Sequence, residues 1–308
     1  MNIKAIDFLG KRQWAYIFSS LLLLVSIGSL ATQGLKMGID FTGGTLVEVA
    51  YQNAADLTVM RAALADEGFG DAMVQHFGSA RDVLIRLKPD ETVSSAELSA
   101  RVVAAINKKT AEPAELRRVE FVGPQVGDEL AEDGGLAMLY SMFGVLIYIA
   151  WRFEYKFALG SVAALIHDVI ITLGFFSLFG LEFDLTVLAA LLAVIGYSLN
   201  DTIVVFDRIR DNFRLLRQVG SEEVMNTSLN ETLSRTLMTS FTTILVLIAL
   251  AVLGGEIIHN FSVALLVGIL IGTYSSIYVA SPIVLALGIT QKDLMVPIKE
   301  GTDVDDLP

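Results

Sequence analysis

Six long apolar runs restrict what this chain can fold into. A helix needs about 20 predominantly apolar residues to cross the hydrocarbon core of a bilayer, and most of these runs come close to that length or exceed it. The composition agrees, because 54% of the 308 residues are hydrophobic and only 18% are charged. The short second run is predicted to begin near Gly134. We predict an α-helical membrane protein with six spans, at residues 14–31, 136–151, 157–179, 185–206, 236–253 and 261–287.

The first run has a competing interpretation as a secretory signal peptide, in which Ser29 and Ala31 would be the small residues of a cleavage site. The apolar region of a signal peptide has about 7–15 residues, which is shorter than this run. Because five further spans follow, we interpret the run as an uncleaved anchor.

A polar block of domain size lies between the first and second spans. Its pattern predicts a strand, a helix, two strands, a second helix and a last strand, which is the order of a ferredoxin-like α+β domain. We therefore divide the chain into a cytoplasmic N-terminal segment 1–13, a span 14–32, an external α+β domain 33–133, a five-helix membrane region 134–287 and a cytoplasmic tail 288–308.

Basic residues predict the orientation of the chain. The termini and short loops on one side carry Lys and Arg, whereas the short loops 180–184 and 254–260 on the other side carry none. Cytoplasmic loops are enriched in Lys and Arg, so both termini are predicted to be cytoplasmic and the domain 33–133 to lie outside. The residues that carry this pattern are Lys4, Lys11, Arg12, Arg152, Lys156, Arg208, Arg210, Arg214, Arg217, Arg235, Lys292 and Lys299.

The composition also excludes several kinds of site. The chain has no cysteine, which rules out disulfides and thiolate metal ligands. Its three histidines are scattered and form no metal-binding motif, and we predict no metal and no other cofactor. A net charge of −12 argues against nucleic acid as a partner. No phosphate-binding loop motif is present.

Asp201 is the residue that makes the fourth span unusual. A carboxylate at the centre of a spanning helix costs about 2.5–3.5 kcal/mol, and acids within the membrane usually mark functional sites. The span 185–206 places Asp201 about four to six residues from its cytoplasmic end, and Arg235 begins the next span on the same side. We predict that Asp201 and Arg235 form a proton relay. A static ion pair that fixes the helix register is the alternative.

His167 and Asp168 lie near the middle of the third span. Two interpretations of this pair stay open, namely a secondary proton relay and a polar contact between helices. Adjacent residues point about 100° apart on a helix, which argues against direct sharing of a proton between the two side chains.

The last span carries a small residue at every fourth position, which predicts a face for close helix packing with Gly268 and Gly272 at its centre. In the polar block, Gly43 and Gly44 predict a hinge or tight turn, with a ligand-binding loop as the alternative. Residues 121–127 predict a turn from the domain into the second span.

Several motifs carry a resemblance to a known family. Together with the order of one span, one external domain and five spans, they resemble the SecF family over essentially the whole chain. This family comprises the smaller subunits of the bacterial SecD–SecF accessory translocase. The motifs are Asp40-Phe41-Thr42-Gly43-Gly44, VGPQVG at 122–127, His167-Asp168-Val169, GYSLNDTIVV at 196–205, DRIR at 207–210 and Ser234-Arg235-Thr236.

The resemblance implies a resistance-nodulation-division superfamily protein that pairs with the six spans of SecD in the bacterial inner membrane, with the domain 33–133 in the periplasm. Such a pair uses the proton gradient to complete the export of unfolded polypeptides through the SecYEG channel, after the SecA ATPase has pushed them in. The relay residues of the family correspond to Asp201 and Arg235, and a further relay acid comes from SecD. The resemblance implies no enzymatic chemistry, and membrane lipid surrounds the spans.

Three alternatives belong to other classes. The first is a structural subunit that stabilises its partners without conducting protons. The second is a small-molecule or lipid exporter of the same superfamily, although such exporters usually carry twelve spans and two large external domains in one chain. The third is an intramembrane aspartyl protease that uses Asp168 and Asp201, but the Gly-rich motifs that such enzymes require around their acids are absent.

Overall fold

The computed structural model describes residues 6–89, 93–110, 112–216 and 218–294. Lys4, Arg217 and Lys299 of the charge pattern, and residues 295–308 of the predicted tail, lie outside these ranges. Within them, six helices are long and apolar enough to cross a membrane, which confirms the predicted number of spans. The helices are Leu9–Thr32, Pro124–Arg152, Tyr155–Phe179, Leu185–Leu215, Ser221–Leu253 and Ile257–Ala286.

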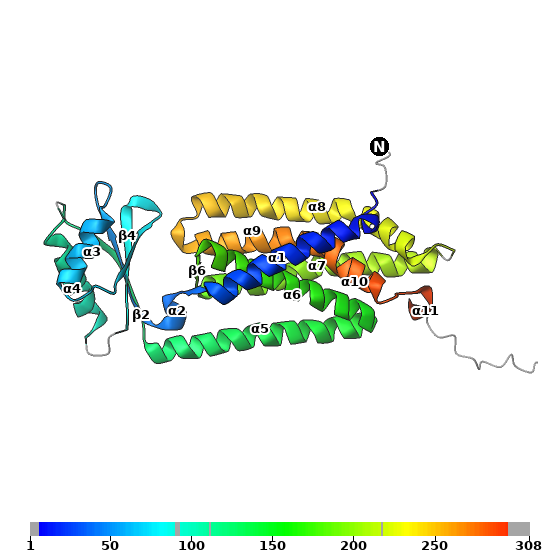
Figure 1. The fold of residues 1–308 in the computed structure, drawn as a ribbon, viewed down its shortest axis with the longest axis horizontal. Helices are drawn as coiled ribbons and strands as arrows, with labels where there is room; N and C mark the ends of the chain where they lie inside the picture. Colours follow the sequence, from blue (N-terminus) through cyan, green and yellow to red (C-terminus); the bar gives the residue numbers. More distant parts are fainter. Residues whose placement is uncertain (1–5, 90–92, 111, 217, 295–308) are drawn as a thin grey trace, which may run out of the picture.

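These helices form an elongated bundle with a small α+β domain beyond one end (Figure 1). Figure 1 labels them, in chain order, α1 (Arg12–Thr32), α5, α6, α7, α8 and α9 (Glu256–Ser275). The last span does not end with α9, because it continues through a π-helical segment, Ser276–Ala280, into α10 (Ser281–Ala286). About half of the apolar stretches of α6, α7 and the last span is buried, whereas α1, α5 and α8 are largely exposed. The three buried spans therefore form the interior of the bundle, and the exposed ones face lipid or a partner.

Three helices extend beyond the apolar runs that predict them. Helix α5 begins at Pro124 rather than near Gly134, α7 continues past residue 206 to Leu215, and α8 begins at Ser221 rather than at residue 236. Hydropathy detects only the part of a helix that contacts lipid, whereas a helix that already satisfies its own backbone hydrogen bonds can continue into polar sequence. The predicted boundary between the external domain and the membrane region, at residues 133 and 134, consequently falls inside α5.

The α+β domain has the predicted ferredoxin-like fold. Its elements are β2 (Gly44–Ala50), α3 (Leu57–Asp66), β3 (Met73–Phe77), β4 (Ser79–Leu87), α4 (Ser95–Asn107) and β5 (Glu115–Val122). The strands lie in the order β3-β4-β2-β5, and all three neighbouring pairs are antiparallel. Asp56 accepts hydrogen bonds from the Thr58 and Val59 backbone N–H groups and thereby caps α3.

Alternation along the strands gives the sheet two different apolar faces. Val47 and Ile85 point toward α3 and α4 and form the main core of the domain with Met60, Val102 and Ile106. The neighbouring residues point to the opposite face, where Leu46 and Leu84 pack with Ile39 of α2 (Ile39–Thr42). This second face is the one that the domain turns toward the bundle.

The domain is joined to the bundle through backbone contacts as well as side chains. Strand β1 (Lys36–Met37), which follows α1, pairs in parallel with β6 (Glu182–Phe183), which lies between α6 and α7. The predicted turn at Gly43 and Gly44 is present, with φ of 67° and 130°. Gly127 at the start of α5 packs against this turn, and a Cβ atom there would lie 2.8 Å from the Gly43 backbone nitrogen.

The core of the α+β domain gives a first prediction. Ile106 is fully buried beneath the sheet, and Ile106→Ala is expected to lower the free energy of unfolding of the domain by about 2–5 kcal/mol, because it leaves a cavity. The measurement is proteolysis of the domain in membrane vesicles at increasing urea concentration. Ala100→Ser, on the exposed face of the same helix, is the control, and an unchanged urea midpoint for Ile106→Ala would contradict the prediction.

Candidate functional site

Asp201 lies in the interior of the bundle on α7 (Leu185–Leu215). Its exposed fraction is only 3%, and its Oδ2 atom is buried without a hydrogen-bond partner. Among the described residues, no basic group lies within ion-pair distance of Asp201. Because α7 continues to Leu215, Asp201 is farther from the end of its helix than the apolar run predicts.

Arg235 lies on α8 (Ser221–Leu253), about one helical turn nearer the α7–α8 loop than the level of Asp201. The hydrogen bonds from Tyr197 to Thr243 and from Asn212 to Ser228 set the register of the two helices and place Asp201 opposite residue 239. The charge of Arg235 acts on the Asp201 carboxylate, and Ser240, one turn farther along α8, approaches the same carboxylate. Arg235 itself is exposed on the outer surface of the bundle. The structure thus places the two predicted residues on adjacent helices, about one turn apart, without joining them in an ion pair.

Asp168 is the centre of a second buried polar cluster, at the middle of α6 (Tyr155–Phe179). Its side chain is fully buried. Its Oδ2 accepts hydrogen bonds from Ser198 Oγ of α7 at 2.6 Å and from Ser275 Oγ of α9 at 2.8 Å. Its Oδ1 lies 2.9 Å from Nδ1 of His167. The expectation that adjacent helical residues point too far apart to interact is therefore wrong for this pair, because the imidazole turns back toward the carboxylate.

The small-residue face of the last span packs against α7. Gly268 lies against Val194, so closely that a Cβ atom at Gly268 would overlap the Val194 side chain. A Cβ atom at Gly272 would lie 3.0 Å from Cβ of Ser198, the residue that donates to Asp168. The absence of a side chain at Gly272 thus allows α9 to approach α7 at the level of the Asp168 cluster.

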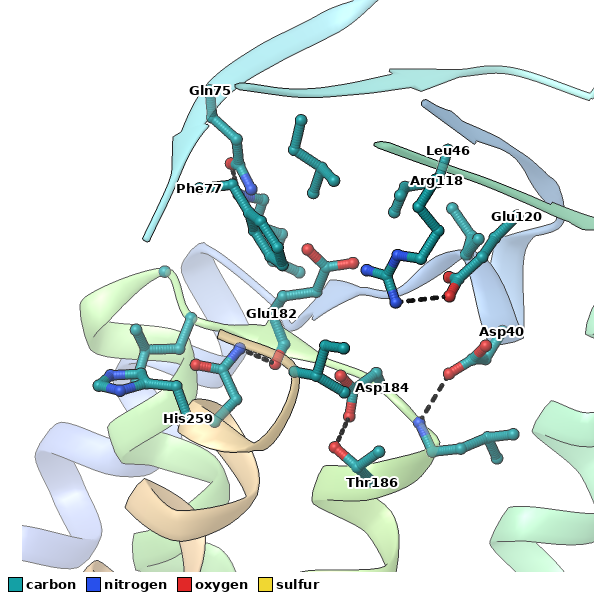
Figure 2. A pocket seen from close by; sticks show the side chains of 18 of the residues that line it. Asp40, Leu46, Gln75, Phe77, Arg118, Glu120, Glu182, Asp184, Thr186 and His259 are labelled. Carbon is teal, nitrogen blue, oxygen red and sulfur yellow. Dashed lines mark hydrogen bonds and ion pairs between the residues drawn. The ribbon is translucent and has the colours of Figure 1, made fainter. Parts of the chain in front are cut away.

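A cavity of about 640 Å³ lies between the α+β domain and the adjacent end of the bundle (Figure 2). Carboxylates from both sides line it, namely Asp40 and Glu120 from the domain side and Glu182 and Asp184 from the bundle. Asp40 Oδ2 accepts a hydrogen bond from the Leu185 backbone N–H at 2.9 Å, and Asp184 Oδ1 accepts one from Val187 N–H at 2.8 Å. Two acids from distant parts of the chain therefore cap the first turn of α7.

Glu182 connects the domain to the bundle at the edge of this cavity. It forms an ion pair with Arg86 of β4, and Arg86 also donates to the Met37 carbonyl oxygen at 2.9 Å. Burial raises the pKa of Glu182 and outweighs the charges of Arg86 and Lys36, which lower it. Glu182 could not be predicted from the sequence, because an acid in a short loop carries no signal until the fold places it between two parts of the structure.

No group of three or more histidine or acidic side chains suited to holding a metal ion is present in the ranges that the structure describes. The arrangement consists of buried acids and hydroxyl groups inside a helical bundle, with Arg235 exposed nearby on its outer surface. Carboxyl groups can bind and release protons, and their position defines the class of protein as a polytopic membrane protein with ionisable groups within the membrane.

Comparisons with known proteins identify the family. Residues 102–290 match the family described as "Protein export membrane protein SecD/SecF, C-terminal", and residues 28–55, which include Gly43 and Gly44, match the "SecD/SecF GG Motif". The chain belongs to this SecD/SecF family of protein export membrane proteins. It is 53% identical to the protein translocase subunit SecF of Vibrio alginolyticus, over 99% of this chain and 98% of that protein. It is 46% identical to SecF of Escherichia coli O157:H7, over 97% of this chain and 94% of that protein.

A solved structure supports the fold over nearly the whole chain. The crystal structure of SecDF, a translocon-associated membrane protein from Thermus thermophilus, superposes with a TM-score of 0.84 at 38% identity, and the match covers 92% of this chain and 38% of the longer SecDF chain. SecDF in its super-membrane-facing form, also at 38% identity, gives a TM-score of 0.69 over 93% of this chain and 39% of that one. The chain as a whole therefore superposes better on the first of these two structures.

Proposed function

We propose that this chain is a SecF-like subunit that works with SecD and uses the proton motive force to drive late steps of protein translocation through the SecYEG channel. SecA acts earlier, and the substrate is the unfolded exported polypeptide. The names of the relatives, and the length over which they match, support the role in translocation. The chain itself carries no catalytic chemistry in this proposal.

The observation that carries the proton-coupled role is the position of Asp201. An acid that is 3% exposed and has an unpartnered oxygen costs free energy that a purely structural helix would avoid. Arg235, on the adjacent helix, is exposed on the outer surface of the bundle, where a partner can approach it. We propose that Asp201 and Arg235 form the relay on this subunit and that SecD supplies a further acid.

The available energy is sufficient for such a role. One charge that crosses 100 mV provides about 2.3 kcal/mol, and a 100-fold change in the populations of two conformations requires about 2.7 kcal/mol. One or two protons per cycle can therefore bias a movement of the external domain.

The proposal places the chain in the bacterial inner membrane with both termini in the cytoplasm and the α+β domain in the periplasm. Lys11 and Arg12 at the start of α1 and Arg152 at the end of α5 lie at the end of the bundle opposite the domain, as the enrichment of basic residues on the cytoplasmic side requires (Figure 1).

A structural subunit that conducts no protons is the second candidate. In that role Asp201 and Arg235 would be expected to form a fixed ion pair, and no such pair is present among the described residues. An exporter of small molecules or lipids within the same superfamily is disfavoured by the relatives, which carry the name of a protein translocase subunit over almost their full length.

The test uses vesicles that contain this chain with SecD, SecYEG and SecA. Export from vesicles with the unchanged chain is expected to fall when an ionophore collapses the proton gradient. Asp201→Asn is expected to leave the complex intact but to remove the part of export that depends on the gradient. Asp211→Asn, an exposed acid on the same helix, is the matched control. Gradient-dependent export that persists in Asp201→Asn would reject the relay.

A further inference from the structure

The Asp168 cluster has no role in the relay described above, yet it contains the most deeply buried acid of the bundle. The polar side chains in contact with Asp168 come from three helices. Its own helix presents His167, α7 presents Ser198 and α9 presents Ser275, and the Tyr274 ring of α9 stacks on His167. Among the described residues, no Lys or Arg lies within ion-pair distance of Asp168. A permanent negative charge there would be stabilised by hydrogen bonds alone.

The hydrogen bonds around Asp168 can be satisfied in both protonation states. When the carboxylate is ionised, it accepts from Ser198, Ser275 and His167. When it is protonated on Oδ2, it can donate to Ser275 Oγ, because the hydroxyl hydrogen of Ser275 has a second acceptor in the Gly272 carbonyl oxygen at 3.1 Å. Only one hydroxyl group has to rotate for the proton to be accommodated.

His167 contacts the Asp168 carboxylate through one ring nitrogen only. Its Nε2 atom is buried and has no hydrogen-bond partner. A second proton on the imidazole would create a buried cationic N–H without an acceptor, which is costly. Nδ1 of His167 lies 2.9 Å from Asp168 Oδ1, where it can donate a hydrogen bond to the ionised carboxylate.

Two features connect this cluster to the rest of the bundle. Ser198 lies three residues before Asp201 on α7, which is a rise of about 4.5 Å toward the α+β domain. Ser275 is the last residue before the π-helical segment Ser276–Ala280. Such segments are rare and are found frequently at functional sites. A change in the hydrogen bond from Ser275 to Asp168 therefore acts on the residue that directly precedes the π-helical segment of the last span.

We propose that Asp168, held by His167, Ser198 and Ser275, is a second proton-binding site, on the side of Asp201 that faces the external domain. One proton from the external side converts the carboxylate to a carboxylic acid, and its release restores the carboxylate and its three accepted hydrogen bonds. The inference rests on the proposed proton-coupled function, because it places Asp168 before Asp201 for protons that enter from outside.

The test uses infrared difference spectra of the full complex in vesicles between mildly alkaline and mildly acidic pH. With Asp201→Asn as background, a C=O band of a buried carboxylic acid is expected to remain on acidification. It is expected to disappear when Asp168→Asn is added and to shift with Ser275→Ala, which removes one hydrogen bond. Ser177→Ala, a buried serine of α6 that bonds to Ser29 at 2.8 Å, is the control and is expected to leave the band in place.

A band that survives Asp168→Asn, or the absence of any such band, would overturn the inference. If Asp168→Asn does not assemble, Ser275→Ala decides the question, since a shifted band supports the site and an unmoved band rejects it. Export measurements separate this inference from the proposed function. If gradient-dependent export is lost in Asp201→Asn but retained in Asp168→Asn, the proposed function holds and the second site is rejected. If Asp201→Asn leaves gradient-dependent export unaffected, the proposed function itself is rejected.

Discussion

Gly268→Leu is expected to prevent stable assembly of the membrane region. The Cβ atom alone would overlap Val194 of α7, and a leucine adds three further carbon atoms to the same space. Overpacking of a well-packed interior typically costs about 1–3 kcal/mol and in some cases more. Here α7 and α9 would have to move apart, at a level between the external domain and the Asp168 cluster.

The smaller change Gly268→Ala makes this prediction quantitative. It is expected to lower the midpoint of thermal aggregation in detergent, and Val194→Ala in the same chain is expected to restore much of that loss by removing the methyl groups that the new Cβ meets. Gly196→Ala is the matched control. It lies on α7 with no atom within 4 Å of the added carbon, so it is expected to be neutral or slightly stabilising through helix propensity. Equal effects at positions 196 and 268 would contradict the packing argument.

Docking of the α+β domain on the bundle is expected to strengthen as the pH falls. Burial raises the pKa of Glu182 in the docked state, so the docked state binds a proton more tightly than a state in which Glu182 is in water. The contribution of Glu182 to the stability of the docked state is therefore fully present at low pH, and it is lost as the pH rises through the raised pKa of Glu182. Each unit of difference between the two pKa values corresponds to about a tenfold change in the docking equilibrium.

The chain contains no cysteine, so two introduced cysteines can carry spin labels without further changes. Suitable positions are Ala62 on the exposed face of α3 and Val252 near the domain end of α8. The distance distribution is expected to broaden toward longer values at alkaline pH, and Glu182→Gln is expected to abolish this dependence. Glu120→Gln, in the same cavity but paired with Arg118 inside the domain, should retain it. The opposite direction of the pH effect would show that the ion pair with Arg86 outweighs burial.

Much of the architecture could be predicted from the sequence because the signals are local. The six apolar runs identify the spans, and the alternation of strands and helices identifies the ferredoxin-like domain. Asp201 was identifiable because an acid is conspicuous in an apolar helix. The polar extensions of α5, α7 and α8 were not predicted, since hydropathy does not report helix that continues outside lipid.

The composition of the Asp168 cluster could not be predicted. Serine is ordinary in membrane helices, and the partners Ser198 and Ser275 lie 30 and 107 residues from Asp168 in the chain. Their convergence depends on which faces of α6, α7 and α9 meet, and the small-residue face around Gly272 was the only part of that contact visible in the sequence. Glu182 was missed for the same reason, because its partner Arg86 is 96 residues away.

The backbone pairing between β1 and β6 has a mechanical consequence. Main-chain hydrogen bonds join the strand after α1 to the strand before α7, and Asp40 reaches from the next turn to the first N–H of α7. Pulling on α7 along its axis would therefore load the sheet of the external domain through short, stiff links rather than through flexible side chains. Most substitutions of side chains along β1 and β6 would leave this transmission of force intact, and cutting it would require a residue such as proline, which removes the donor itself.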